Sequence, residues 1–511
     1  MLRQVFAATA AVTLLAGCSG GDDKSNDSPK DGAVQTSSTP TPPAPTAYDP
    51  PKAFQAVAAS ALPEEKGRSS FKPQVAMAGT TAVANSLSGA VGQSVTGEKP
   101  WQTLSTETTD DSVVTNDATQ PAVVQLDGKS AVAVVYYQRI KGGGTAKPSV
   151  QALFRWLDPA DGKPISEAMV DVTPLLGDNE VNSGLPGGFT DLAVDASTGQ
   201  VAVGVAPTSL IGAKSGVITV IADPGTKKGV AVPFMKPAGL GKGVLVGAQG
   251  KENTRRTLAF VDAATGKVTK SGLLPGLEGL EPTGALGSKY AYLYGQKYTE
   301  GIGSYGTGDY VGNLYAVDPA TGQVVQTKTA VKKTRYLFGY TCHADAQKTV
   351  VCSTDPGATE DEIVGFDDTT GKKLWGYTAT SPGRVVPTVS AVFHGMVYAT
   401  VQQKPVLVNA LTGQDVPVPT PTATPTGTPG ASTTPTDGSM PTDDITPGDT
   451  STPSDSSSPS GTPGVGPVPT TPDFEPLSPV GVSEYGGAYL READVSEDDV
   501  VGSLQILKAI G

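Results

Sequence analysis

The sequence predicts an all-β fold, a β-propeller of seven four-stranded blades, with eight blades as the alternative. Two observations predict it. A turn of the pattern Asp-x-x-Thr-Gly recurs between apolar strands, and the spacings between successive copies of its glycine are 56, 49 and 42 residues (Gly266, Gly322, Gly371 and Gly413). A period of about 40–50 residues that holds four short strands is typical of propeller blades. The composition agrees, because 62 glycines and 43 prolines suit many short strands joined by turns.

The repeated pattern is a hairpin turn. Its clearest copies are Asp262–Gly266, Asp318–Gly322, Asp367–Gly371 and Asn409–Gly413, and looser copies occur at Asp158–Gly162 and Asp223–Gly225. The Asp or Asn side chain accepts hydrogen bonds from the turn's own backbone, and glycine takes the positive φ that returns the chain into the next strand. The same short segment therefore predicts both a turn and the strands on either side of it.

The strands between these turns group into six units, each the size of one blade: 121–173, 186–235, 236–276, 277–333, 336–378 and 384–418. Three further strands are expected at the C-terminus, at 479–483, 487–490 and 503–509, and a fourth is missing. We expect Thr96–Trp101, which matches Thr370–Trp375, to lie beside Ser503–Ala509 as that strand. Closure by a strand from the N-terminal part would remove the open sheet edge. Residues 73–95 could add strands, hence the eight-blade alternative.

The remaining segments divide the chain. Residues 1–17 are expected to be a signal peptide and 18–50 a disordered tether, because 19–50 contain almost nothing to bury. Within 51–95 the helical spacing of Phe54, Val57, Ala58 and Leu62 predicts a short helix. The propeller is expected over 96–511, interrupted by a disordered Pro/Thr/Ser-rich insertion at 416–473, which a fold can carry because lengthening a loop costs only about 0.6 kcal/mol per doubling.

The apolar run Val5–Gly17 is too short to span a hydrocarbon core of about 30 Å, so it fits a signal peptide better than a membrane anchor. It ends in Leu15-Ala16-Gly17-Cys18, which resembles the lipobox of bacterial lipoproteins. The resemblance implies that Cys18 carries a diacylglycerol as the first residue of the mature protein. The chain would then be exported and lipid-anchored to the outer side of the cell membrane. The alternative is an ordinary secreted protein with a cysteine near its cleavage site.

The extended pattern Asp-x-x-Thr-Gly-x-x-x-Trp, clearest at Asp367–Trp375, resembles the repeat of pyrroloquinoline-quinone-type propellers over about residues 96–418 and 474–511. That group includes quinoprotein alcohol dehydrogenases and a non-enzymatic lipoprotein that assists outer-membrane protein assembly. The dehydrogenases resemble one another in a pair of adjacent cysteines over the quinone. Here Cys342 and Cys352 are ten positions apart, and no motif identifies a catalytic Asp or calcium ligands. The resemblance therefore favours the fold without the enzyme, and no cofactor is expected.

Other chemistries find little support in the sequence. A net charge of −13 argues against nucleic acid as a partner. Three cysteines and two histidines, His343 and His394, form no metal cluster, and neither histidine is placed for a catalytic triad. No catalytic or metal-binding residue is therefore assigned. Cys342 and Cys352 are expected to face each other across one hairpin, and in an exported protein they should form a disulfide.

Function is expected on the loops of one face. Strands alternate in direction, so the B–C and D–A connections share a face, and the long ones fall there: Ile140–Ser149, Gln296–Gly312, Glu492–Gly502 and 416–473. Tyr298, Tyr305 and Tyr310 in the second of these are the candidate contact surface. The leading hypothesis is a tethered binding or assembly scaffold for an unknown protein or envelope ligand. The alternatives are a degenerate quinoprotein dehydrogenase and a purely structural envelope protein.

Overall fold

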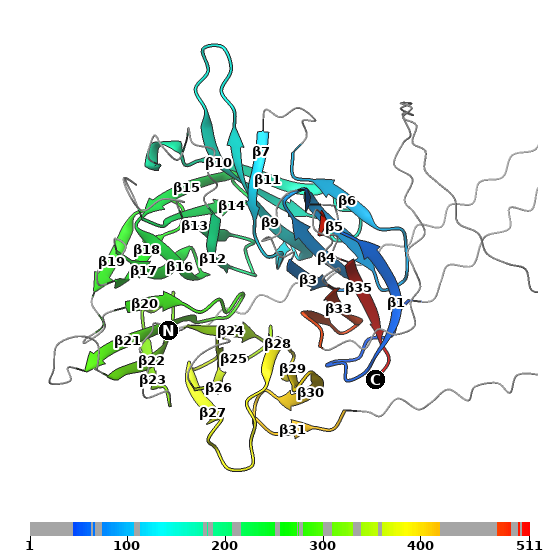
Figure 1. Ribbon diagram of the computed structural model, residues 1–511. Helices are drawn as coiled ribbons and strands as arrows, with labels where there is room; N and C mark the ends of the chain where they lie inside the picture. Colours follow the sequence, from blue (N-terminus) through cyan, green and yellow to red (C-terminus); the bar gives the residue numbers. More distant parts are fainter. Residues whose placement is uncertain are drawn as a thin grey trace, which may run out of the picture. The chain divides into compact units, whose positions relative to one another are not determined.

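The computed structural model shows eight antiparallel β-sheets arranged as the blades of a propeller (Figure 1). All of them belong to the unit Pro45–Gly511. The structure describes residues 44–62, 65–66, 74–106, 113–176, 181, 188–206, 216–250, 256–272, 274, 279–299, 309–330, 339–355, 360–418, 478–491, 499–500 and 503–511.

Each blade has strands A to D, counted from the centre of the ring outward. Blades 1 to 4 consist of β3 (Gln74–Ala78), β4 (Thr81–Ser86), β5 (Gly89–Ser94) and β6 (Trp101–Leu104); β7 (Val113–Ala118) with β8 (Ala122–Leu126), β9 (Lys129–Ile140), β10 (Ser149–Leu157) and β11 (Pro164–Asp171); β12 (Gly188–Val194), β13 (Val201–Ala206), β14 (Ile218–Asp223) and β15 (Lys228–Pro233); and β16 (Met235–Gly241), β17 (Val244–Gln249), β18 (Thr257–Asp262) and β19 (Val268–Gly272).

Blades 5 to 8 consist of β20 (Gly279–Pro282), β21 (Ala291–Thr299), β22 (Asp309–Val317) and β23 (Val324–Lys328); β24 (Tyr340–Ala344), β25 (Thr349–Thr354), β26 (Glu362–Asp367) and β27 (Lys372–Thr378); β28 (Thr388–Phe393), β29 (Met396–Val401), β30 (Lys404–Asn409) and β31 (Asp415–Val416); and β32 (Gly481–Ser483), β33 (Gly486–Arg491), β35 (Ser503–Ala509) and β1 (Phe54–Ala61). A two-stranded sheet, β2 (Glu65–Lys66) with β34 (Asp499–Val500), and a 3₁₀ turn, η1 (Thr173–Leu175), complete the described elements.

The six units predicted from the turns correspond to blades 2 to 7, and the three predicted C-terminal strands are β32, β33 and β35. The number of blades is eight, the alternative of the two numbers considered. The additional blade comes from residues 74–104, where β3, β4 and β5 precede the strand that contains Trp101. These strands contain many small residues and lack the repeated turn pattern, so the pattern did not mark them.

The ring is closed by a different N-terminal strand from the one predicted. β1 pairs antiparallel with β35, with Phe54 opposite Ala509 and Ala61 opposite Ser503. Trp101 instead lies in β6, the outer strand of blade 1, opposite Gly92 of β5.

The helix predicted over 54–62 is therefore wrong. The apolar spacing of this segment fits a helix, but its pairing partner β35 lies more than 440 positions away in the sequence. Local periodicity cannot detect such a partner. The pairing gives β35 a neighbour and buries Ser60, so long-range sheet formation decides the conformation.

The repeated turn has the predicted geometry. In the copy after β18, Asp262 Oδ1 accepts hydrogen bonds from the Thr265 backbone N–H at 2.9 Å and from the Thr265 hydroxyl at 2.8 Å. The Gly266 N–H donates to the Asp262 carbonyl oxygen at 2.8 Å, and Gly266 has φ +69°. The hydrogen bonds from Thr265 hold the pKa of the Asp262 carboxyl below its usual range.

The same turns also join neighbouring blades. The glycine that ends a turn packs against the outer part of the preceding blade. A Cβ atom at Gly413 would lie 2.6 Å from Cδ2 of Trp375, and one at Gly371 would lie 2.9 Å from Cβ of Ala316. The Trp375 indole N–H donates to the Ala410 carbonyl oxygen at 2.7 Å, and Trp101 donates to Pro159 at 3.0 Å. Glycine is needed here both for its backbone conformation and for the missing side chain.

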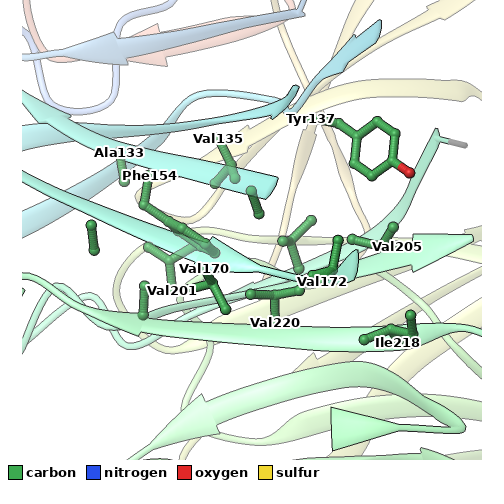
Figure 2. Close-up of a cluster of buried hydrophobic side chains, with 14 of the residues drawn as sticks. Ala133, Val135, Tyr137, Phe154, Val170, Val172, Val201, Val205, Ile218 and Val220 are labelled. Atoms are coloured by element: carbon green, nitrogen blue, oxygen red, sulfur yellow. The ribbon is translucent and has the colours of Figure 1, made fainter. Parts of the chain in front are cut away.

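Most of the core lies between blades. Figure 2 shows the cluster between blades 2 and 3, where β9, β10 and β11 face β13 and β14. Side chains such as Phe154, Val203 and Ile218 are fully buried in it. Valine and alanine dominate because β-branched and small side chains fill the narrow space between two twisted sheets.

A glycine substitution tests the interblade contact. Gly413→Ala should destabilise the protein by about 2–4 kcal/mol, because the strain at positive φ adds to the overlap with Trp375. Gly383→Ala is the matched control, since Gly383 has φ +68° but no atom within 4 Å of its Cβ position. It should cost only the backbone strain of about 1–2 kcal/mol. Chemical denaturation of both variants measures the difference, and equal losses would contradict the packing argument.

Ring closure by β1 gives a second test. Removing residues up to 61 should lower the stability of the whole propeller by several kcal/mol, because β35 would lose its paired neighbour. Removing residues only up to 42 is the control and should leave the thermal midpoint unchanged. Circular dichroism melting compares the two truncations. A normal midpoint without β1 would show that the ring does not depend on this strand.

Candidate functional site

The two ends of the propeller carry different connections. Within each blade the A–B and C–D turns lie at one end, which we call the turn end, and the B–C and D–A connections lie at the other, the connection end. The Asp-x-x-Thr-Gly turns belong to the turn end. The connection Lys141–Pro148 belongs to the connection end, where β9 and β10 form a hairpin that projects from the ring (Figure 1).

Part of the predicted contact surface, Tyr298 and Tyr310, lies in β-strands where a loop was expected. β21 continues to Thr299 and β22 begins at Asp309, so the expected loop Gln296–Gly312 is shorter than predicted. Tyr298 lies opposite Tyr310 in the register of these two strands. Tyrosine and threonine favour strands, and they extend the hairpin where the sequence had suggested a loop. Tyr305 lies outside the described residues, as do 419–473 of the predicted insertion and 492–498 and 501–502 of the predicted connection Glu492–Gly502.

The N-terminal segment joins the ring at the turn end. The Tyr48 N–H donates to the Glu484 carbonyl oxygen at 2.7 Å, and the Asp49 carboxylate pairs with the His394 ring. Glu484 and His394 belong to the A–B turns of blades 8 and 7. The Tyr398 hydroxyl donates to the buried Pro51 carbonyl oxygen at 2.6 Å. The chain therefore enters the propeller from the turn end. Cys18 and the predicted signal peptide lie outside the described residues.

A cavity of about 460 Å³ opens at the turn end, with several carboxylates in its wall. Three of these carboxylates are bonded across blade boundaries. Asp195 Oδ2 accepts from the Lys242 N–H at 3.1 Å, and Asp345 Oδ2 accepts from the Gly395 N–H at 3.1 Å. Asp368 Oδ2 accepts from the Lys289 N–H at 2.6 Å. Their hydrogen-bonding capacity holds adjacent blades together.

Asp368 shows how strongly these groups are built into the ring. Burial raises the pKa of Asp368 to about 6, against the opposing effect of hydrogen bonds from the Lys289 and Tyr290 backbone and the Tyr292 hydroxyl. Those bonds come from blade 5, whereas Asp368 follows β26 in blade 6. Replacing its partners with a ligand would weaken the contact between two blades. We therefore assign the turn-end carboxylates a structural role.

A larger cavity, of about 790 Å³, lies among the inner strands toward the connection end. The inner parts of five blades line it, from Gln74 of β3 to Tyr340 of β24. The charged side chains among its lining residues are all acidic: Asp117, Asp191, Glu281 and Asp355.

Three of the four carboxylates have strong partners. Glu281 pairs with Lys236 at 2.7 Å and with Arg256. Asp117 Oδ2 accepts from the Phe189 N–H at 2.6 Å, which links blades 2 and 3. Asp355 Oδ1 accepts from the Thr341 hydroxyl at 2.7 Å.

Asp191 differs from the others. Its Oδ2 atom is shielded from solvent and has no hydrogen-bond partner among the described residues. Burial raises the pKa of Asp191, and the charges of Lys236 and Arg256 and a hydrogen bond with Thr190 oppose that rise only in part. No sequence pattern indicated this residue, because the four carboxylates come from separate blades and form no motif.

Both histidines, the residue type that a catalytic triad would require, lie in the described part of the chain. Burial lowers the pKa of His343 to about 4, so this imidazole is neutral at physiological pH. The His394 ring pairs with Asp49 at the turn end. Among the residues that the structure describes, no three His, Cys, Asp or Glu side chains are grouped to hold a metal ion. In the same part of the chain, no helix is long and apolar enough to cross a membrane.

Solved structures with a similar chain path are β-propellers and other proteins of low sequence identity. The β-propeller domain of the Trilobed protease from Pyrococcus furiosus is 12% identical, with a TM-score of 0.32 over 57% of this chain and 80% of that one. Apo AztD from Citrobacter koseri is 14% identical, with a TM-score of 0.34 over 68% and 84%. The dihydro-heme d1 dehydrogenase NirN is 13% identical, with a TM-score of 0.37 over 68% and 65%. These likenesses concern the fold alone. No protein-family model and no curated protein matches the chain.

Cys342 and Cys352 face each other in the register of β24 and β25, with Cα atoms 4.0 Å apart and their sulfur atoms bonded. The bridge is predicted to form in an oxidising compartment and to add about 2–4 kcal/mol of stability. Thiol labelling of denatured, non-reduced protein checks this, and neither cysteine should react. Reduction before denaturation is the control and should expose both thiols. Two reactive thiols without reduction would refute the bridge.

Proposed function

We propose that this chain is an exported, lipid-anchored and non-catalytic scaffold that binds a protein or cell-envelope ligand at the connection end of its propeller. The observation that carries the proposal is the contrast between the two cavities. At the turn end, Asp195, Asp345 and Asp368 bond to backbone N–H groups of adjacent blades. At the connection end, the larger cavity retains a carboxylate oxygen without a partner, on Asp191, among the described residues.

The place where the N-terminal segment joins the propeller also favours binding at the connection end. Tyr48 and Asp49 are fixed at the turn end, and Cys18 precedes them by about thirty residues. An anchor on Cys18 would therefore attach the propeller through its turn end. The connection end, with the projecting β9–β10 hairpin, would be the end open to a partner. Loops and cavities on a rigid scaffold are the usual place of binding.

The proposal includes a repeat of the quinoprotein type, and it includes no catalytic activity. The alternative, a degenerate quinoprotein dehydrogenase, is favoured only by the resemblance of the Asp367–Trp375 pattern. A dye-reduction assay with added quinone and calcium separates the two. Quinone-dependent turnover would overturn the non-catalytic proposal.

Site-specific photo-crosslinking in intact cells tests the binding end. A photoreactive amino acid at Gln120, an exposed residue of the connection-end cavity, should give a discrete crosslinked adduct. The same amino acid at Gln347, an exposed residue of the turn-end cavity, is the matched control and should give none. An adduct from Gln347 alone, or from neither position, would contradict the proposal.

The anchor is tested in the same cells. Cys18→Ala should move the protein from the membrane fraction to the soluble fraction, and mass spectrometry of the N-terminal peptide should find a diacylglycerol on Cys18. An unmodified N-terminal peptide that begins elsewhere would end the lipoprotein part of the proposal.

A further inference from the structure

We propose that the connection-end cavity binds a cationic group, an ammonium or guanidinium, carried by a basic peptide segment or by a small organic polyamine. The inference rests on the proposed function, which places binding at the connection end, and it names the chemical class of ligand that this end would bind.

The cavity wall has one sign of charge. Its charged lining residues are the four carboxylates, and the two cations nearest to them, Lys236 and Arg256, are bonded to Glu281. Four carboxylates against two cations leave a net charge of −2 around the cavity, although Lys236 and Arg256 also act on Asp191. A concave site with carboxylates of one sign concentrates the field and attracts cations. The net charge of −13 on the whole chain acts in the same direction.

Asp191 supplies a specific contact. A buried carboxylate with an unbonded oxygen loses the hydrogen bonds that water would give it, and this loss disfavours the charged form. Because Oδ2 is shielded, a ligand in the cavity reaches it only when the Asp191 side chain changes its χ1 rotamer and turns this oxygen toward the cavity. An N–H donor that reaches Asp191 through the cavity would supply the missing bond. A charged donor would bind most strongly, because hydrogen bonds between ions are stronger than those between neutral groups.

The shape and lining fit an organic cation. A volume of about 790 Å³ lies within the range of small-ligand pockets, and Phe189, Leu192 and Leu286 add apolar surface. The stem of a lysine, arginine or polyamine buries along such surface while its charged end meets a carboxylate. A divalent metal would need several grouped ligands, and the described residues hold no such group.

The turn-end cavity provides the contrast. It also has carboxylates, but Lys242 and Lys289 line it, and Asp195, Asp345 and Asp368 accept backbone hydrogen bonds between blades. A cation there would have to displace the contacts that hold the ring. No such displacement is required at Asp191.

Isothermal titration of the full chain in detergent tests the inference with three probes: an acetylated hexalysine peptide, spermidine and calcium chloride. Hexalysine or spermidine should bind at one site, and calcium should not compete. Binding of hexalysine alone would identify a basic peptide segment as the source of the cation. Binding of both would identify any organic polyamine.

Substitutions locate the site. Asp191→Asn should weaken binding by about tenfold or more, because it removes one partner of a buried charged pair and keeps the shape of the side chain. Asp161→Asn is the matched control at an exposed aspartate, and it should change the affinity by less than about twofold. Asp355→Asn gives a second reading at the cavity and should weaken binding in the same direction. Thermal melting shows whether each variant is folded.

Two results would overturn the inference: no binding of either organic cation, or equal affinities in the wild type and Asp191→Asn. Neither would overturn the proposed function, provided that Gln120 still crosslinks to a partner. Loss of the Gln120 adduct together with tight, Asp191-dependent cation binding would support this inference and contradict the proposed function. The cavity would then bind a small cation and no macromolecular partner.

Discussion

The close approach of turn glycines such as Gly371 and Gly413 to the blade before them is the contact on which the ring depends. At Gly413 the space beside the backbone is filled by the Trp375 indole, whose N–H also bonds to the Ala410 carbonyl oxygen. One short turn thus ends a hairpin, fixes the distance to its neighbour and orients that neighbour's outer strand. Repetition of such contacts sets the angle between successive blades, so the inner strands converge on a common channel.

The turn could be read from the sequence because all of its requirements are local. An Asp or Asn side chain caps a backbone only a few residues away, and glycine alone tolerates both the positive φ and the indole beside it. Blades 2 to 7 followed from that single pattern. Ring closure did not, because it depends on β1 meeting β35 across almost the whole chain. The likeness of Thr96–Trp101 to Thr370–Trp375 reflected the same outer-strand position in two blades, and it was misread as a closing strand.

The candidate site was beyond local reasoning for a related physical reason. Asp191 and Asp368 are both aspartates on or beside apolar strands, and neither lies in a pattern that separates a binding group from a structural one. What separates them is the number of partners that neighbouring blades supply. Asp368 receives hydrogen bonds from two backbone N–H groups and a tyrosine hydroxyl, whereas one oxygen of Asp191 receives none among the described residues. That difference exists only after the ring has formed.

The ring geometry also explains why an unsatisfied carboxylate can persist at the connection end. The turns at the turn end are tight, and carboxylates there accept hydrogen bonds from backbone N–H groups. The inner strands at the connection end form their ladder hydrogen bonds within their own blades. Each carboxylate placed there must find a donor, as Asp117, Glu281 and Asp355 do, or keep a cost in stability. Residues that reduce stability without a structural benefit are characteristic of binding sites, because the cost is recovered when a ligand supplies the missing partner.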